Sequence, residues 1–178
     1  YAFLQPIFPG LAPFDTWYPD VCYRNRHGFC RNAVVREGDA VVSSAMTTAE
    51  WSGGALIGGV ATAQTHRRQG LAGACVRALV GTLTKEGRQV YVVCPAVESE
   101  DPENGKTVPF GVRKEDLFGS FTEAPTLKAA VDFSSELQKA LPDIKVGFLH
   151  GKMKSKEKDA VMAAFAQNEI GVLVSTTV

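Results

Sequence analysis

The stretch from Thr65 to Ala72 carries the residues whose types and spacing best suit the binding of a phosphate group. Arg67 and Arg68 supply two guanidinium groups that can clamp phosphate oxygens. Gly70 lets a ligand approach the backbone without a Cβ in the way. A helix N-terminus here would add unpaired amides and a partial positive charge, which together favour a pyrophosphate. Taken alone, the same residues also fit an exposed arginine pair ahead of an ordinary amphipathic helix.

Other residues that could do chemistry are fewer. Glu50 and His66 are candidate general bases, although each is also explained as a polar surface residue. No general acid is identified, so the catalytic residues stay unknown. The set Cys22, His27 and Cys30 matches no standard zinc spacing, and no metal site is predicted.

The elements that must position this loop follow from the apolar periodicity. Residues 32–36 and 40–48 form a predicted hairpin around a Glu-Gly-Asp turn, and 55–62 is a strand loosened by two glycines. Residues 71–86 carry the strongest helical pattern of the chain, with a stop at Gly87. The run 90–94 is typical of a central parallel strand, in which Tyr91 belongs to the core.

The remaining segments extend this pattern. Residues 1–31 read as loop with at most a short helix, and the acidic, Gly- and Pro-containing stretch 96–124 as a linker or insertion. A helix from Thr126, a strand over 145–149, a helix capped by Ser155 and a strand over 171–175 follow. We therefore expect an α/β fold with a mixed sheet. An antiparallel hairpin on the N-terminal side leads into a mostly parallel βαβαβαβ arrangement with flanking helices.

Residues 57–62 and 66–72 together resemble the core of the GNAT N-acetyltransferases, over about residues 11–94. The family signature Gln/Arg-x-x-Gly-x-Gly/Ala is met by Arg67, Gly70 and Ala72. The resemblance implies acetyl-CoA as cofactor and transfer of acetyl to an amine, whose identity the sequence does not give. It places the pantetheine arm against the backbone of Val60, Ala61 and Thr62, and the pyrophosphate at Arg67, Arg68, Gln69, Gly70, Leu71 and Ala72.

The chain departs from that family after Cys94. Typical members continue with a helix bearing a tyrosine that protonates the departing thiolate, then a Gly-Phe turn and a last hairpin. None of these is recognisable here. We therefore expect an acetyl-CoA-binding, N-acetyltransferase-like module that is catalytically incomplete, and whether it is an enzyme stays open.

The second half carries another resemblance. The segments 90–95, 98–100, 146–165 and 172–178 resemble the second motor domain of RecG-type ATP-dependent DNA helicases, over about residues 90–178. This implies that His150, Gly151 and Lys152 lie near a DNA backbone and that Thr176 and Thr177 begin a motif contacting DNA. The phosphate loop Gly-x-x-x-x-Gly-Lys-Ser/Thr does not occur, so ATP use by this chain alone is not expected.

Both resemblances include the strand 90–94, which is the natural junction of a hybrid. The predicted division is residues 1–94 as the acyl-CoA-binding half, 95–125 as an acidic linker or insertion, and 126–178 as part of a RecA-like motor domain. The alternatives are a helicase fragment that is inactive alone, and a folded hybrid without activity. Residues 95–178 carry ten Lys and Arg against thirteen Asp and Glu, so any DNA binding should be weak.

The composition indicates the cellular compartment of the protein. No apolar run reaches the roughly 18 residues needed to span a bilayer, and no basic-then-apolar leader is visible. Of the four cysteines, Cys75 and Cys94 lie inside apolar periodic segments, where a buried free thiol is the usual outcome, and this light cysteine usage is typical of a reducing compartment. We expect a cytoplasmic protein without a membrane partner.

Overall fold

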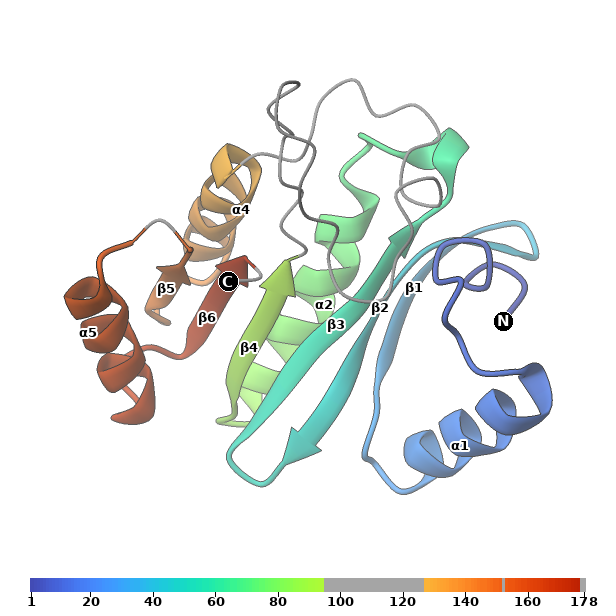
Figure 1. The fold of residues 1–178 in the computed structure, drawn as a ribbon, viewed down its shortest axis with the longest axis horizontal. Helices are drawn as coiled ribbons and strands as arrows, with labels where there is room; N and C mark the ends of the chain where they lie inside the picture. Colours follow the sequence, from blue (N-terminus) through green and yellow to red (C-terminus); the bar gives the residue numbers. More distant parts are fainter. Residues whose placement is uncertain (95–126, 152, 177–178) are drawn as a thin grey trace.

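One six-stranded sheet runs through the part of the chain that the computed structural model describes, residues 1–94, 127–151 and 153–176 (Figure 1). Its spatial order is β1-β2-β3-β4-β6-β5. The strands are β1 (Asn32–Glu37), β2 (Ala40–Trp51), β3 (Gly54–Thr62), β4 (Gln89–Cys94), β5 (Val146–Leu149) and β6 (Val172–Thr176). The helices are α1 (Phe14–Arg26), the 3₁₀ turn η1 (Gln64–His66), α2 (Leu71–Lys85), α4 (Leu127–Ala140) and α5 (Ser155–Ala166).

The sheet changes from antiparallel to parallel at β3. Strands β1, β2 and β3 pair antiparallel, whereas β3–β4, β4–β6 and β6–β5 pair parallel. The predicted mixed α/β sheet with flanking helices is confirmed. Strand β5 precedes β6 in the chain but lies outside it, so the connection from β4 to β5 passes over the place that β6 occupies.

Strands β3 and β4 separate part of the way along their length. Their parallel register runs from Gly54 opposite Gln89 to Ile57 opposite Val92 and stops there. Strand β3 continues to Thr62, while the end of β4 pairs with β6. At Gly59, φ is +56°, and the register between β2 and β3 shifts at this point, which marks a bulge. Gly58 and Gly59, the two glycines that interrupt the predicted strand, therefore lie where β3 diverges from β4.

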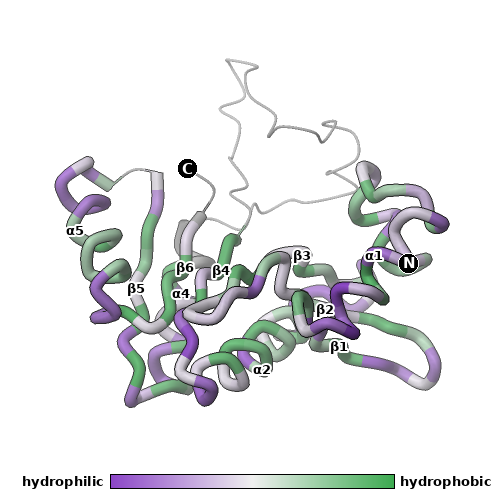
Figure 2. The backbone as a smooth tube through the Cα atoms, turned by 90° about the horizontal axis from the view of Figure 1, so that it is seen from below, coloured by the Kyte–Doolittle hydropathy of each residue, from purple (hydrophilic) through white to green (hydrophobic). Residues whose placement is uncertain are grey.

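Helices α2 and α4 cover one face of the sheet (Figure 2). The apolar face of α2 packs on the central strands, as its periodicity predicted. Leu137 of α4 joins the same core, and Arg77 of α2 pairs with Glu136 of α4 at 3.4 Å. The core contains residues from both predicted halves: Ala45, Ala55, Ile57, Cys75, Val76, Leu79, Val80, Leu83, Val90, Val92, Leu137, Val172 and Val174.

Helix α5 lies on the opposite face, beside β5 and β6 (Figures 1 and 2). It packs on a smaller cluster in which the Tyr91 and Phe165 rings lie 6.3 Å apart. Tyr91, predicted to belong to the core, is partly buried and packs against the edge of this cluster. The predicted cap, Ser155, is instead the first helical residue. Lys154 occupies the N-cap position, and its backbone N–H donates to Glu157 Oε2 at 3.1 Å. The interpretation of Ser155 as the cap was therefore wrong by one residue.

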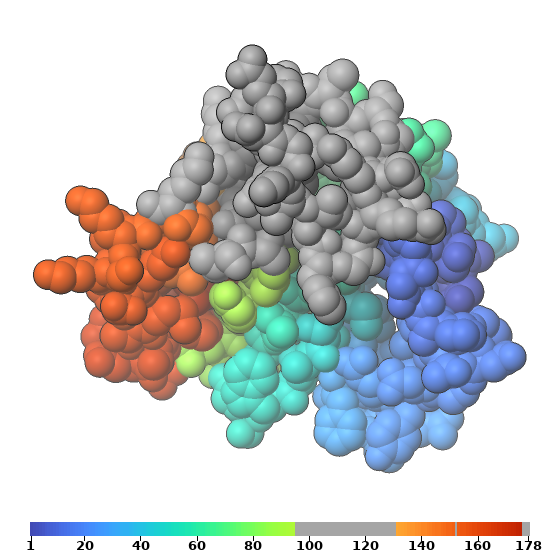
Figure 3. All heavy atoms as spheres, viewed as in Figure 1, coloured from blue at the N-terminus to red at the C-terminus, as the bar shows by residue number. Residues whose placement is uncertain are grey.

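The N-terminal region is more regular than the sequence indicated. Residues 14–26 form a 13-residue helix, α1, in a segment that we read mainly as loop. The helix contains Pro19 and has no buried residue, so no amphipathic stripe marks it. On the face drawn in Figure 3, α1 and the preceding segment lie at the side of the molecule opposite α5.

Two findings concern the described residues as a whole. None of the described helices combines the length and apolar character needed to cross a membrane. The whole predicted linker, residues 95–125, lies outside the described residues.

Candidate functional site

The predicted phosphate loop connects β3 to α2 through a sharp change of backbone direction. After η1, Arg67 is extended, Arg68 has φ of +61° and Gly70 has φ of +74°. Gly70 is the N-cap of α2, and a Cβ built on it would meet no atom of the described residues within 4 Å. The left-handed backbone at this position favours glycine, and no described side chain fills the space in front of it.

The first turn of α2 presents free amides to that space. Among the described residues, the backbone N–H groups of Gly70, Leu71, Ala72 and Gly73 have no hydrogen-bond acceptor, and the first bond runs from Ala74 N–H to the Gly70 carbonyl at 3.0 Å. No acidic side chain lies in this first turn. The unpaired donors and the positive end of the helix dipole together form a seat for an anion.

The two arginines of the loop differ in position. Arg67 Nε donates to the Thr62 carbonyl at 3.3 Å, so this half-buried side chain ties the loop to the end of β3. Arg68 is exposed beside the helix N-terminus. Gln69, next to Gly70, is exposed as well. Arg68 is therefore the better-placed cation for an anion seated on α2, a distinction that the sequence could not make.

Strand β3 offers an open side next to this loop. Ala61 and Thr62 pair with Ser44 and Ser43 of β2, and the Ser43 hydroxyl donates to the Ala61 carbonyl at 3.0 Å. On the side facing β4, no described residue pairs with β3 beyond Ile57. An extended chain can add beside Val60–Thr62 in this gap by main-chain hydrogen bonds.

Neither candidate base lies free in this gap. His66 Nε2 contacts Glu37 Oε2 at 3.1 Å, and its Nδ1 contacts the Thr65 hydroxyl at 2.8 Å. Glu50 lies at the other end of the strands, since it pairs with Ala55 near the start of β3. Its side chain, 1% exposed, contacts Arg31 Nε at 3.2 Å and an Arg88 guanidinium nitrogen at 3.1 Å. The structure thus contradicts the interpretation of Glu50 as a base.

Glu50 is instead the centre of an ion-pair cluster that sequence reasoning missed. The Thr47 hydroxyl donates to Glu50 at 2.7 Å, and Glu86 contacts both Arg31 and Arg88. The hydrogen bond from the Arg31 guanidinium lowers the pKa of the Glu86 carboxyl below its ordinary value of 4.5. The cluster joins β1, β2, the end of α2 and the start of β4. Its members lie too far apart in the chain for spacing to reveal it.

The thiols give no reactive centre. Cys75 is buried, as predicted, and burial raises the pKa of the half-buried Cys94 thiol, which stays protonated and poorly nucleophilic at neutral pH. Within the described ranges, no group of three or more His, Cys, Asp or Glu side chains could hold a metal ion.

The residues expected near DNA follow strands β5 and β6. Leu149 pairs with Ser175, which places His150 and Thr176 side by side at the ends of neighbouring strands. His150 Nδ1 is buried and has no hydrogen-bond partner in the described part of the chain. Gly151 is exposed, whereas Lys152 and Thr177 lie outside the described residues. Since β3, β4, β6 and β5 are parallel, their carboxyl ends, and thus the α2 loop and His150, share one edge of the sheet.

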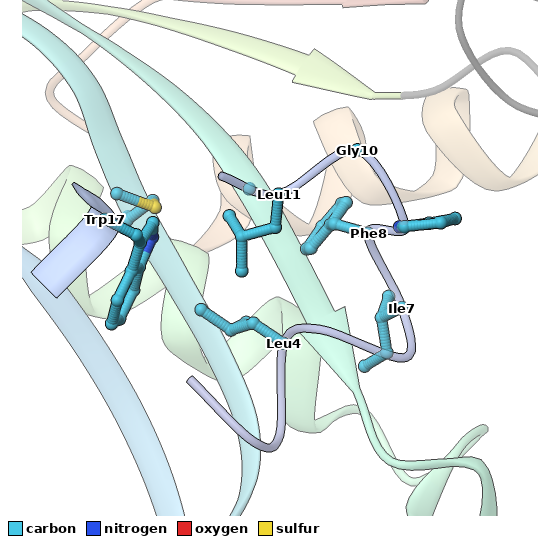
Figure 4. A pocket seen from close by; sticks show the side chains of 9 residues that line it. Leu4, Ile7, Phe8, Gly10, Leu11 and Trp17 are labelled. Atoms are coloured by element: carbon cyan, nitrogen blue, oxygen red, sulfur yellow. The ribbon is translucent and has the colours of Figure 1, made fainter. Parts of the chain in front are cut away.

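An apolar pocket that the sequence did not predict opens on the face away from α2 (Figure 4). Its volume is about 360 Å³. The N-terminal segment forms most of its wall, and Met46 and the bulge residue Gly59 form the rest. Leu4 and Leu11 point into it in Figure 4. None of the described residues that line it is charged: Leu4, Ile7, Phe8, Pro9, Gly10, Leu11, Trp17, Met46 and Gly59.

Comparison with protein-family models gives two overlapping matches. The model described as "Acetyltransferase (GNAT) family" matches residues 2–103. The model described as "Helicase conserved C-terminal domain" matches residues 72–178. The overlap, 72–103, contains most of α2 and all of β4. The strand that both resemblances shared therefore lies inside both matches.

Curated relatives match about half of the chain. A protein named ATP-dependent DNA helicase RecG from Staphylococcus epidermidis is 38% identical over 94 residues, which is 53% of this chain and 11% of the relative. The protein of the same name from Escherichia coli K12 is 39% identical over 93 residues, 52% of this chain and 10% of the relative. The chain thus spans about a tenth of the length of these relatives. No solved structure gives a significant match.

Proposed function

Because the chain belongs to the GNAT acetyltransferase family over residues 2–103 and to the helicase C-terminal domain family over residues 72–178, we propose that its first half is an acetyl-CoA-binding module of the N-acetyltransferase type. The observation that carries this proposal is the open N-terminus of α2, where four amides have no acceptor among the described residues. The pyrophosphate would lie on Gly70, Leu71 and Ala72, flanked by Arg68 and Gln69. Arg67 would hold the loop to β3.

The gap between β3 and β4 supports a position for the pantetheine arm. The amide groups of the pantetheine arm would form hydrogen bonds with the backbone of Val60, Ala61 and Thr62 on the side of β3 that faces the gap. A strand amide would polarise the thioester carbonyl while an amine attacks its carbon and the C–S bond breaks. No residue is assigned to protonate the departing thiolate, so we expect turnover to be weak or nil. The acceptor amine is not identified.

Titration calorimetry of the whole chain with acetyl-CoA tests this proposal. Gly70→Ala places a methyl group in the space that the pyrophosphate would fill, and we expect affinity to fall at least about tenfold, or 1.4 kcal/mol. Gly87→Ala is the matched control, because Gly87 has φ of +75° and equally open surroundings at the far end of α2. No heat at millimolar acetyl-CoA, or equal losses in the two variants, would contradict the proposal.

A charge reversal separates the two arginines. We expect Arg68→Glu to weaken acetyl-CoA binding strongly, and the wild-type affinity to fall as salt is raised. Arg26→Glu, an exposed reversal in the last turn of α1, should leave the affinity unchanged. Unchanged binding by Arg68→Glu would mean that the guanidinium group does not face the ligand.

A second function concerns the helicase half. The helicase C-terminal domain family matches residues 72–178, and relatives named ATP-dependent DNA helicase RecG are 36–39% identical to this chain over 93–96 residues. Together these matches favour a DNA contact in the helicase half. We infer that His150, Gly151, Lys152, Thr176 and Thr177 contact a DNA backbone weakly, with no ATP-driven activity of this chain alone.

Fluorescence anisotropy with a branched DNA tests this second function. We expect a weak signal at low salt that disappears near 200 mM salt. Lys152→Glu should reduce it, and Lys139→Glu, an exposed residue in the last turn of α4, should not. No signal at low salt would exclude the DNA contact. Failure of both titrations would leave a folded hybrid without activity.

The division into residues 1–94, 95–125 and 126–178 stays a prediction, as does a cytoplasmic location. The free thiols of all four cysteines fit a reducing compartment. Solvent-exposed segments are cut first by proteases. Limited proteolysis that cuts within 95–125 and leaves both flanks intact would support the division.

A further inference from the structure

The apolar pocket beside the bulge of β3 has no role in the functions proposed so far. We infer that it takes the hydrocarbon part of an acyl group longer than acetyl, so that the preferred thioester is a medium-chain acyl-CoA. This inference rests on the proposed binding of the cofactor at α2 and β3, and it adds the class of acyl group.

The order of residues along β3 relates the pocket to the proposed cofactor position. The proposed pyrophosphate seat at Gly70 lies beyond the carboxyl end of the strand, at Thr62. A pantetheine arm running back from Thr62 to Val60 covers three strand residues, or about 10 Å. The next residue is Gly59, which lines the pocket. The acyl end of the cofactor would therefore arrive at the mouth of the pocket.

Gly59 is suited to this mouth. Its φ of +56° belongs to the bulge, and it brings no side chain between β3 and the pocket. A Cβ at this position would lie 2.9 Å from Cγ of Met46, so the Met46 side chain lies directly against the Gly59 backbone. Met46 is flexible, and its side chain would shift to let a carbon chain pass the glycine.

The lining selects a hydrocarbon over the acceptor amine. The described side chains that line the pocket are apolar, and none of these is charged. A protonated amine would lose its hydration there and gain no ionic partner. An alkyl chain gains affinity instead, roughly fourfold for each buried methylene. The volume, about 360 Å³, falls within the range of roughly 300–1,000 Å³ typical of small-molecule sites.

Calorimetry with a series of thioesters tests the inference. CoA, acetyl-CoA, butyryl-CoA and hexanoyl-CoA are titrated separately into the whole chain. We expect CoA and acetyl-CoA to bind similarly and hexanoyl-CoA at least about tenfold more tightly. Absence of binding by CoA itself would overturn the proposed function. Binding of CoA with no gain from the longer chains would overturn the inference alone.

A filled pocket provides the matched variant. Leu11 points into the pocket, and Leu11→Trp should remove the advantage of hexanoyl-CoA over acetyl-CoA. Met162→Trp adds the same ring at an exposed position of α5 and should keep the advantage. An advantage that persists in a folded Leu11→Trp variant would overturn the inference.

A spectroscopic measurement covers the case in which Leu11→Trp does not fold. The chain has two tryptophans: Trp17 lines the pocket, and Trp51 is exposed. In a Trp51→Phe variant the emission reports on Trp17. Saturating hexanoyl-CoA should shift this emission, whereas saturating acetyl-CoA should not. Identical spectra with the two thioesters would contradict the inference.

Discussion

A single carboxylate joins four segments at one end of the sheet. Glu50 is 1% exposed and contacts the guanidinium groups of Arg31 and Arg88, which also contact Glu86. A buried charge remains stable only when partners and hydrogen bonds replace its hydration, and here Thr47 supplies a further hydrogen bond. The cluster is therefore a structural feature, well away from the α2 loop.

Removal of this carboxylate should be costly. We expect Glu50→Gln to lower the free energy of unfolding by about 3 kcal/mol, because two partly buried guanidinium groups lose the buried carboxylate that they share. Urea denaturation measures the change. Glu136→Gln removes the exposed partner of Arg77 and should cost less than about 1 kcal/mol. Equal losses in the two variants would contradict a special role for Glu50.

The same cluster predicts a pH dependence. The Arg31 hydrogen bond lowers the pKa of Glu86 in the folded state, so the folded protein holds the ionised carboxylate more strongly than the unfolded chain does. This contribution to stability is complete above the ordinary pKa of 4.5 and is lost as pH falls through the lower folded pKa. Comparison of wild type with Glu86→Gln in urea at pH 7 and below pH 4.5 should show a stability difference that shrinks in acid. A difference that is constant with pH would contradict it.

At the scale of elements, the best-predicted part is the unit from β3 through α2 to β4. Its helix has a strict apolar period, and glycines mark its two ends and the bulge. The sequence predicted at most a short helix where the 13-residue α1 forms, because none of its residues is buried and Pro19 interrupts the pattern. The spatial order of β6 and β5 could not be predicted from the sequence either, since periodicity identifies strands but does not order them in a sheet.

Part of the candidate site was predicted from the sequence and part was not. The loop residues 67–72 were predicted because helix-terminus chemistry is local in sequence. The different positions of Arg67 and Arg68 depend on a single backbone turn at Arg68, where φ is +61°. The pocket is formed by residues 4–17 together with Met46 and Gly59, and such long-range contacts leave no local signal.

The start of α5 gives a prediction for one element. We expect Glu157→Ala to destabilise the protein by about 0.5–1 kcal/mol, because the Lys154 N–H loses the carboxylate that caps it. Ser155→Ala should have a smaller effect, since Ser155 is inside the helix and makes no capping bond. Thermal denaturation followed by circular dichroism compares the two. A larger loss in Ser155→Ala would restore serine as the cap.

At the scale of the whole molecule, two family matches share one sheet and one principal core. Leu137 and Val174 from the second half pack in the same cluster as Ile57 and Leu83 from the first. The ladder between β4 and β6 joins the halves through five paired positions from Val90 to Cys94. A shared core of this kind favours unfolding in one transition.

Truncation of a core side chain in one half should therefore destabilise the other half as well. We expect Leu137→Ala, at a position with 0% exposure, to cost about 2–5 kcal/mol and to raise amide hydrogen exchange in β2 and β3 as well as in α4. Val131→Ala on the same helix, at 39% exposure, should cost less than about 0.5 kcal/mol. Faster exchange confined to α4, β5 and β6 would indicate that the halves unfold separately.

The place of β6 between β4 and β5 governs how the protein can assemble. During synthesis, β5 leaves the ribosome before the strand that must separate it from β4. Until β6 arrives, the edge of β4 has unpaired backbone groups, and β5 could pair there in a simpler but incorrect sheet. Native assembly must pair β4 with β6, which lie about 80 residues apart in the chain. We therefore expect this pairing to be slow, and to require that the packing of the helices keeps β5 from pairing with the edge of β4 first.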